Sequence, residues 1–263
     1  MDPVVVAAVK DRLNAVRADH GVAIPLAVES GSRAWGFPSP DSDYDCRFVY
    51  VRRMDDYLTP WPRRDVIETP LEGVFDVVGW DLTKALQLLV KGNAAIVEWL
   101  MSPITYAGDP LFRTEFIDLA RVIAPRGRIV RHYLHLGRQQ FRQHVTAHEE
   151  ISLKRLFYVL RPAMALRWMR LNPEISLPPM DFRVLVAGAD LPPAVVALVA
   201  DLLERKARTR EMGVGTVRPE VLALVEREFN PGNEDEGGGT DEEHHAVAAA
   251  FFRRWVRRLD GAV

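Results

Sequence analysis

Side chains alternate in character from Asp43 to Val51, and this pattern constrains the fold more than any other local feature of the chain. In an extended strand, residues two positions apart point to the same face. One face of this segment carries Asp43, Asp45 and Arg47, whereas the other is aromatic or apolar. The pattern predicts a strand with one packed face and one face that holds two carboxylates. Those carboxylates can share a divalent metal ion.

A glycine-serine turn precedes this strand by ten residues. The segment 22–29 reads as a buried strand, and Ser30-Gly31-Ser32 then turns into a short helical piece. Backbone amides at such a turn can bind phosphate, and glycine lets the backbone approach closely. We therefore predict that Gly31 and Ser32 bind the β- and γ-phosphates of a nucleoside triphosphate (NTP), with the Ser32 hydroxyl adding one hydrogen bond.

A neighbouring strand is expected to supply a third carboxylate. Asp76 is the best candidate, because a charged residue inside the apolar segment 74–80 needs compensation. Asp81 is better explained as a helix cap, and Glu72, in a turn, is the weaker alternative. We predict that Asp43, Asp45 and Asp76 are catalytic residues that bind two Mg²⁺ or Mn²⁺ ions.

Each of these motifs has a simpler explanation when it is taken alone. The segment 41–45 could be a turn of Asx type with solvated acids, and an isolated Gly-Ser pair is common in turns. The combination is harder to explain in that way: a Gly-Ser turn, a strand with Asp-x-Asp, and a later strand with an acid. It predicts a metal-dependent nucleotidyltransferase, which moves a nucleoside monophosphate (NMP) from an NTP to a hydroxyl and releases pyrophosphate.

A later helix offers residues for the opposite wall of the site. Lys154, Tyr158 and Arg161 are spaced i, i+4 and i+7, so they share one face. A lysine, an arginine and an aromatic ring suit a triphosphate and a stacked base. Pro162 removes one amide from the helix, and we expect the resulting bend to direct Tyr158 and Arg161 into the cleft. The alternative is a surface Lys/Arg pair with a half-buried tyrosine.

The chain divides into two halves of different character. We predict an α+β fold: a nucleotidyltransferase domain at 1–110, with a mixed sheet flanked by helices, and an all-helical domain at 111–263. The cleft between them is the expected ligand site. The acidic and glycine-rich segment 230–243 is predicted to be a mobile surface loop, followed by a final helix from about 244 to 259.

Charge and cysteine content bound the possible partners and location. The net charge of −2 gives no overall bias toward nucleic acid, but the segment 121–170 contains eleven Arg or Lys against two acids. This segment could bind a polyanion, or it could be a pair of solvated helix faces. Cys46 is the only cysteine, there is no signal-peptide pattern, and no apolar run approaches the ~20 residues of a membrane span. We expect a cytoplasmic protein without membrane contact.

Four histidines lie in pairs with helical spacing, namely His132 with His135 and His144 with His148. Such pairs can bind transition metals, but no acid or cysteine with matching spacing completes a ligand set. We interpret them as surface or core histidines.

The motifs together resemble a known family. They are the segments 29–37, 41–45, 76–82, 98–103 and 154–162. The chain resembles the DNA polymerase β-like nucleotidyltransferase superfamily, and within it the predicted nucleotidyltransferases of a bacterial and phage RNA-repair pathway. The resemblance implies a mixed sheet with flanking helices, two-metal catalysis and an NTP donor. It also implies that Asp43 and Asp45 bind the metals and that Asp76 completes the catalytic-metal site and helps to deprotonate the acceptor.

The acceptor is the part of the reaction that these residues constrain least. An RNA end, a tRNA or another nucleic-acid end is the leading hypothesis, supported by the basic segment 121–170. Transfer to a protein or a small molecule would need the same catalytic core. A different class is a catalytically silent nucleotide-binding module or a toxin–antitoxin regulator, although three acids that repel one another have no evident use in such a protein.

Overall fold

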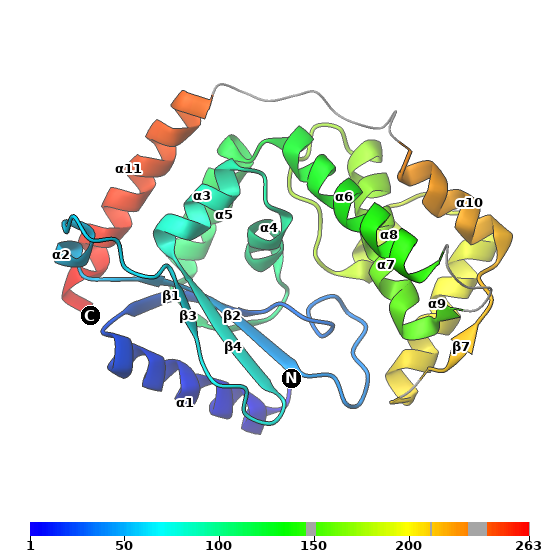
Figure 1. Cartoon of the computed structure of the whole chain (residues 1–263), viewed down its shortest axis with the longest axis horizontal. Helices are drawn as coiled ribbons and strands as arrows, with labels where there is room; N and C mark the ends of the chain where they lie inside the picture. The colour runs from blue at the N-terminus through cyan, green and yellow to red at the C-terminus, as the bar shows by residue number, and fades with distance from the viewer. Residues whose placement is uncertain (146–150, 211, 231–240, 263) are drawn as a thin grey trace.

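The computed structural model describes residues 1–145, 151–210, 212–230 and 241–262. It has an α+β fold, as predicted, with a mixed five-stranded sheet in the first half and mainly helices in the second (Figure 1). The strand order is β3-β4-β2-β1-β5. The strands are β1 (Ala23–Glu29), β2 (Tyr44–Val51), β3 (Val66–Glu68), β4 (Phe75–Asp81) and β5 (Thr105–Gly108).

The strands β2 and β4 run parallel to each other. Every other neighbouring pair in the sheet is antiparallel. The register of the parallel pair aligns Asp45 with Asp76 and Arg47 with Val78. Aligned residues of a sheet share a face, so two of the three predicted metal ligands point to the same side.

Helices cover both faces of this sheet (Figure 1). The side chains of α1 (Pro3–His20) pack on the face that carries Cys46, Phe48 and Tyr50. The opposite face, with Val49 and Val51, packs in a second core with three other helices. These are α3 (Leu82–Val90), α4 (Ala94–Met101) and α5 (Pro110–Ile123). The predicted strand is present and its aromatic face is packed, but the face that carries Asp45 and Arg47 is also packed from Val49 onward.

Capping residues and glycines define the ends of several helices. Asp2 caps α1, which ends at Gly21 in the left-handed conformation, with φ of 57°. Asp81 accepts a hydrogen bond from the Thr83 amide and caps α3, as predicted. Gly92 ends that helix with φ of 71°, and Asn93 caps α4.

The second half contains more than helices. It includes α6 (Arg126–His144), α7 (Leu153–Leu171), α8 (Phe182–Ala187), α9 (Pro193–Arg208), α10 (Pro219–Glu228) and α11 (Asp241–Leu259). A two-stranded pairing of β6 (Ile151–Ser152) with β7 (Val214–Gly215) departs from the predicted all-helical character. No helix among the described residues is both long and apolar enough to cross a membrane.

The last helix returns to the first half of the chain. α11 packs against α3 and α5, and Asp260 accepts a hydrogen bond from the Met54 amide at the start of α2 (Met54–Tyr57) (Figure 1). One core runs without a break from the sheet through α6 and α7 to α11. The domain boundary at residue 110 remains a prediction. Most of the predicted mobile loop, residues 231–240, lies outside the described residues.

Candidate nucleotide and metal site

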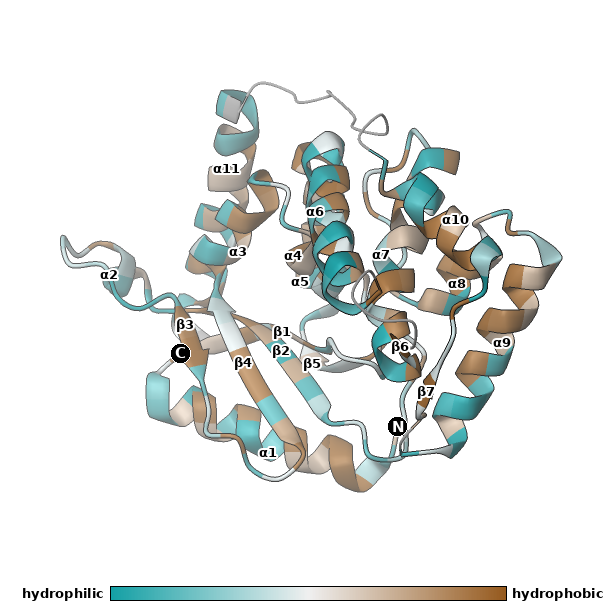
Figure 2. Cartoon of the chain, turned by 45° about the vertical axis from the view of Figure 1, so that its right-hand side comes forward, coloured by the Kyte–Doolittle hydropathy of each residue, from teal (hydrophilic) through white to brown (hydrophobic). Residues whose placement is uncertain are grey.

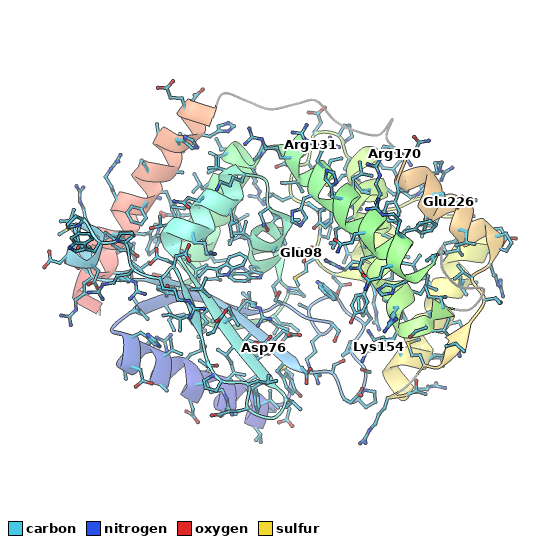
Figure 3. All side chains as sticks on the ribbon, in the orientation of Figure 1. Asp76, Glu98, Arg131, Lys154, Arg170 and Glu226 are labelled. Carbon is cyan, nitrogen blue, oxygen red and sulfur yellow. The ribbon has the colours of Figure 1, made fainter. Side chains whose placement is uncertain are left out.

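A polar cavity of about 320 Å³ lies between the beginning of β2, the start of α7 and the end of α9. It gathers six of the eight predicted site residues: Gly31, Ser32, Asp43, Asp45, Lys154 and Tyr158. In Figure 3, Asp76 lies on the sheet and Lys154 at the N-terminal end of α7. A larger cavity of about 640 Å³ between α3 and α11 is mainly apolar and contains none of these residues.

The carboxylates form a charged patch at the start of the parallel strands. Figure 2 shows hydrophilic bands across β2 and β4, which are otherwise largely hydrophobic. Burial raises the pKa of Asp45, and the nearby carboxylates of Asp76 and Asp43 raise it further, while Arg47 opposes the shift. Both neighbouring carboxylates therefore oppose the ionisation of Asp45, and a cation beside Asp45 would stabilise its charge.

In this structure Arg47 is that cation. Its guanidinium lies 2.7 Å from Asp76 Oδ2 and 3.5 Å from Asp45 Oδ1. With Arg47 bridging these acids, the described residues contain no group of three His, Cys, Asp or Glu side chains arranged to hold a metal ion. The ligand chemistry nevertheless fits Mg²⁺ or Mn²⁺, since all three candidates offer carboxylate oxygens from neighbouring positions. An ion bound there would take over the neutralising role of Arg47.

Gly31 lies directly against the side chain of Asp45. A side chain at this position would place its Cβ 1.7 Å from Asp45 Oδ2, so the missing side chain makes room for the Asp45 carboxylate. The Gly31 amide donates a 3.1 Å hydrogen bond to Glu29 Oε1, and it is therefore engaged within the protein. The Ser32 hydroxyl, which lines the cavity, donates to the Ser42 hydroxyl at 2.9 Å.

Glu29 is a structural residue of the site that the sequence reasoning missed. Its side chain is fully buried at the end of β1. Oε1 accepts hydrogen bonds from the amides of Gly31 and Asp45, both at 3.1 Å, and Oε2 accepts one from the Tyr106 hydroxyl. Burial raises the pKa of Glu29, and these hydrogen bonds oppose the rise. The only signal in the sequence was an acid at the end of an apolar strand.

The three residues predicted on α7 separate into two groups. Lys154 and Tyr158 line the cavity, and Tyr158 is 39% exposed. Arg161 is only 8% exposed and does not line it. Its guanidinium lies 2.6 Å from Glu98 and 4.1 Å from the centroid of the Trp35 ring. Pro162 lies inside α7 as expected. The Arg161 guanidinium, however, lies over the ring of Trp35 and does not line the cavity.

Six further residues line the cavity, among them Trp35 and Lys206. The guanidinium of Arg161 lies over the ring of Trp35. Lys206, from α9, is 3% exposed and also lines the cavity. In the sequence, Lys206 stands in a run of charged residues that is typical of a solvated helix face. No pattern therefore indicated that it lines a cavity.

The basic segment contributes less free charge than its composition suggested. Arg126 donates to the Met169 carbonyl, Arg161 pairs with Glu98, and Arg167 and Arg170 both pair with Glu228. Figure 3 shows Arg131 at the opposite end of the α6–α7 pair from Lys154. Much of this charge therefore stabilises the helical half, which weakens the composition argument for a polyanion surface.

The histidine pairs form no metal site among the described residues. Burial lowers the pKa of His132, and the ring of His144 is buried. His148 lies outside the described residues.

Two comparisons with known proteins bear on this site. A sequence model described as the "RNA repair pathway DNA polymerase beta family" matches residues 5–257. The "uncharacterized protein YcgL" of Bacillus subtilis (strain 168) is 41% identical over 220 residues, which cover 83% of each chain. The family match extends from α1 into α11 and includes every residue that lines the polar cavity.

Proposed function

The chain belongs to the RNA repair pathway DNA polymerase beta family, and we propose that it transfers an NMP from an NTP to a hydroxyl at an RNA, tRNA or other nucleic-acid end. One observation carries this proposal: a single polar cavity joins the glycine-serine turn, the Asp-x-Asp strand and a basic helix end. These are the groups that a reaction between two phosphate-containing substrates requires.

The donor would lie between the turn and α7. Lys154 would bind its phosphates and Tyr158 its base, while the Ser32 hydroxyl and the backbone amides that follow Gly31 in the turn would bind the β- and γ-phosphates. Arg161 would act indirectly. Its ion pair with Glu98 would fix its guanidinium over the ring of Trp35 and so hold that ring at the cavity wall. This arrangement retains the predicted donor site but gives Arg161 an indirect role.

The reaction forms one P–O bond and breaks another. The acceptor oxygen attacks the α-phosphorus, the bond to the β-phosphate oxygen breaks, and pyrophosphate leaves with that electron pair. Asp76 is proposed to accept the proton of the acceptor hydroxyl. Asp43, Asp45 and Asp76 would bind two Mg²⁺ or Mn²⁺ ions, which neutralise phosphate charge and lower the pKa of the acceptor hydroxyl. Arg47 would then release at least one of its two acids.

The family description supports RNA as the acceptor more strongly than the charge distribution does, since several arginines of 121–170 are paired internally. The decisive experiment is incubation with α-labelled NTPs, Mg²⁺ or Mn²⁺, and total RNA. We expect label in RNA and release of pyrophosphate. The double variant Asp43→Ala/Asp45→Ala should abolish both signals.

Other acceptors can be tested in the same experiment. Label that enters protein or small molecules but not RNA would move the acceptor assignment to those classes. If no acceptor is labelled and no pyrophosphate forms, while NTP binding is retained, the chain is a nucleotide-binding module and the proposed enzyme activity is wrong.

A further inference from the structure

Lys206 combines two properties that rarely occur together in a lysine. It is 3% exposed, yet it lines the same polar cavity as Lys154 and Tyr158. Long cationic side chains usually bury their methylene groups and extend the charged end into water. Lys206 instead keeps its ammonium group inside the protein, at the cavity wall.

The ammonium group lies against aromatic rings and not against an acid. Nζ is 4.2 Å from the centroid of Phe37 and 4.9 Å from that of Phe157. No ion pair joins Lys206 to a carboxylate in the described parts of the chain. Cation–π contacts compensate only part of the cost of removing an ammonium from water. A methionine could fill the same space without that cost, so packing alone does not explain the lysine.

The surrounding charges act in opposite directions on this group. Burial and the positive charge of Lys154 on α7 together lower the pKa of Lys206 to about 8, although Asp41 in the loop before β2 acts to raise it. Asp41 itself also faces Lys154 and Arg210. Near neutral pH the cavity thus holds a second, poorly compensated positive charge next to Lys154.

We propose that Lys206 binds the phosphates of the donor nucleotide from the α9 side of the cavity, as the inner partner of Lys154. This inference rests on the proposed function and extends it to a residue outside the helix that carries Lys154 and Tyr158. An anion in the cavity would supply the countercharge that the protein provides only in part, through Asp41. Binding of that anion raises the pKa of Lys206, so at a pH near 8 it is accompanied by proton uptake.

The test is isothermal titration of the intact chain with inorganic tripolyphosphate and with a non-hydrolysable ATP analogue, each with Mg²⁺. Lys206→Met is one heavy atom shorter, so it keeps most of the apolar side chain but removes the charged Nζ that lies over Phe37 and Phe157. We expect its Kd for both ligands to rise roughly 10- to 100-fold, the range for losing one charged hydrogen bond. Lys10→Met, an exposed position on α1, is the matched control and should change Kd less than about twofold.

A second readout separates binding from a packing role. Titrations at pH 8 in two buffers of different ionisation enthalpy should show uptake of about half a proton by the wild type and a much smaller uptake by Lys206→Met. Unchanged affinity and unchanged proton uptake in Lys206→Met would overturn the inference.

The same measurements distinguish this inference from the proposed function. Lys206-dependent binding without nucleotidyl transfer would support the phosphate site and contradict the enzyme assignment. Transfer activity together with a Kd that does not depend on Lys206 would support the enzyme assignment and contradict the phosphate site. A wild-type chain that binds neither ligand would overturn the inference regardless of any other result.

Discussion

Gly31 and Asp45 occupy a space that admits only one side chain. The Asp45 carboxylate fills the volume where a Gly31 Cβ would lie, and Glu29 Oε1 accepts hydrogen bonds from the amides of both residues. At the scale of single residues, the geometry of the site therefore depends on a missing side chain and on one buried acid. Neither Gly31 nor Glu29 needs to contact a substrate in order to affect the proposed nucleotidyl transfer.

The Gly31→Ala variant tests the first of these. The new methyl group must push the Asp45 carboxylate away from its position, so nucleotidyl transfer should fall by about 100-fold or more, as expected for a displacement near 1 Å. Thermal unfolding should change little, because the displaced group is at the cavity. Gly261→Ala, where no atom lies within 4 Å of the added Cβ, is the control. Full activity in Gly31→Ala would show that Asp45 has room to move.

Glu29 is tested through stability. Glu29→Ala leaves two amides and the Tyr106 hydroxyl without their acceptor and should reduce the free energy of unfolding by about 2–4 kcal/mol in urea titrations. Glu29→Gln can still accept both amides and should lose less than about 1 kcal/mol. An equal loss in the two variants would contradict a hydrogen-bonding role.

The raised pKa of Glu29 adds a pH dependence. The folded state retains the proton of Glu29 to a higher pH than the unfolded state does. Its contribution to stability is therefore full below about pH 4.5 and falls as the pH rises through the folded pKa. The free energy of unfolding of Glu29→Gln minus that of the wild type should therefore become more positive as the pH rises over this range. A pH-independent difference would place the pKa of Glu29 at its ordinary value.

At the scale of elements, three helices meet at one buried acid. Glu98 on α4 accepts hydrogen bonds from Tyr133 on α6, at 3.0 Å, and from Arg161 on α7, at 2.6 Å. This junction connects the helices that cover the sheet with the helices of the second half. Arg161, predicted to contact the donor, is thus a link between elements and a support for Trp35.

Arg161→Met separates these roles. It leaves the buried Glu98 carboxylate without its cation and should reduce the free energy of unfolding by about 3–5 kcal/mol. Arg121→Met, which removes an exposed pair with Asp118, should change it by less than about 1 kcal/mol. Urea titration measures both. Unchanged stability together with weaker NTP binding would restore a direct role for Arg161 in the cavity.

The elements differ in how far the sequence determines them. The ends of α1 and α3, and the strands β2 and β4, follow from caps, glycines and alternation within a few residues. β5 was not predicted, because four residues with little alternation become a strand only through pairing with β1. The Arg161–Glu98 pair joins residues that are 63 positions apart in the chain. Local sequence patterns do not predict such a contact, because it depends on how the helices pack.

At the scale of the whole molecule, α11 joins the end of the chain to its beginning. Trp255 is fully buried, its ring lies 4.9 Å from that of Phe112 on α5, and its Nε1 donates to Glu115. The amphipathic pattern of 244–259 predicted the helix but not the surface that it covers. Gly31, Ser32, Asp43, Asp45, Lys154 and Tyr158 line one cavity, whereas the contacts of Glu29 and Lys206 were not predicted from the sequence.

Trp255→Ala measures how strongly α11 supports the first half. Loss of this ring should reduce the free energy of unfolding by about 3–5 kcal/mol, with a single cooperative transition in circular dichroism and fluorescence. Two separate transitions would show that the halves unfold independently. The fragment 1–110 gives a complementary result: without α5 and α11 it should lack a cooperative thermal transition, and a folded fragment would support the predicted boundary.

The shared oxygen of Glu29 has a thermodynamic consequence. One acceptor atom fixes the amide of the turn and the amide of Asp45, so a shift of either segment changes the hydrogen bond of the other. Under the proposed function, a phosphate bound at the turn and an ion bound at Asp45 would be linked through the protein as well as through direct attraction. Such linkage is reciprocal: the factor by which the ion strengthens phosphate binding equals the factor by which phosphate strengthens ion binding.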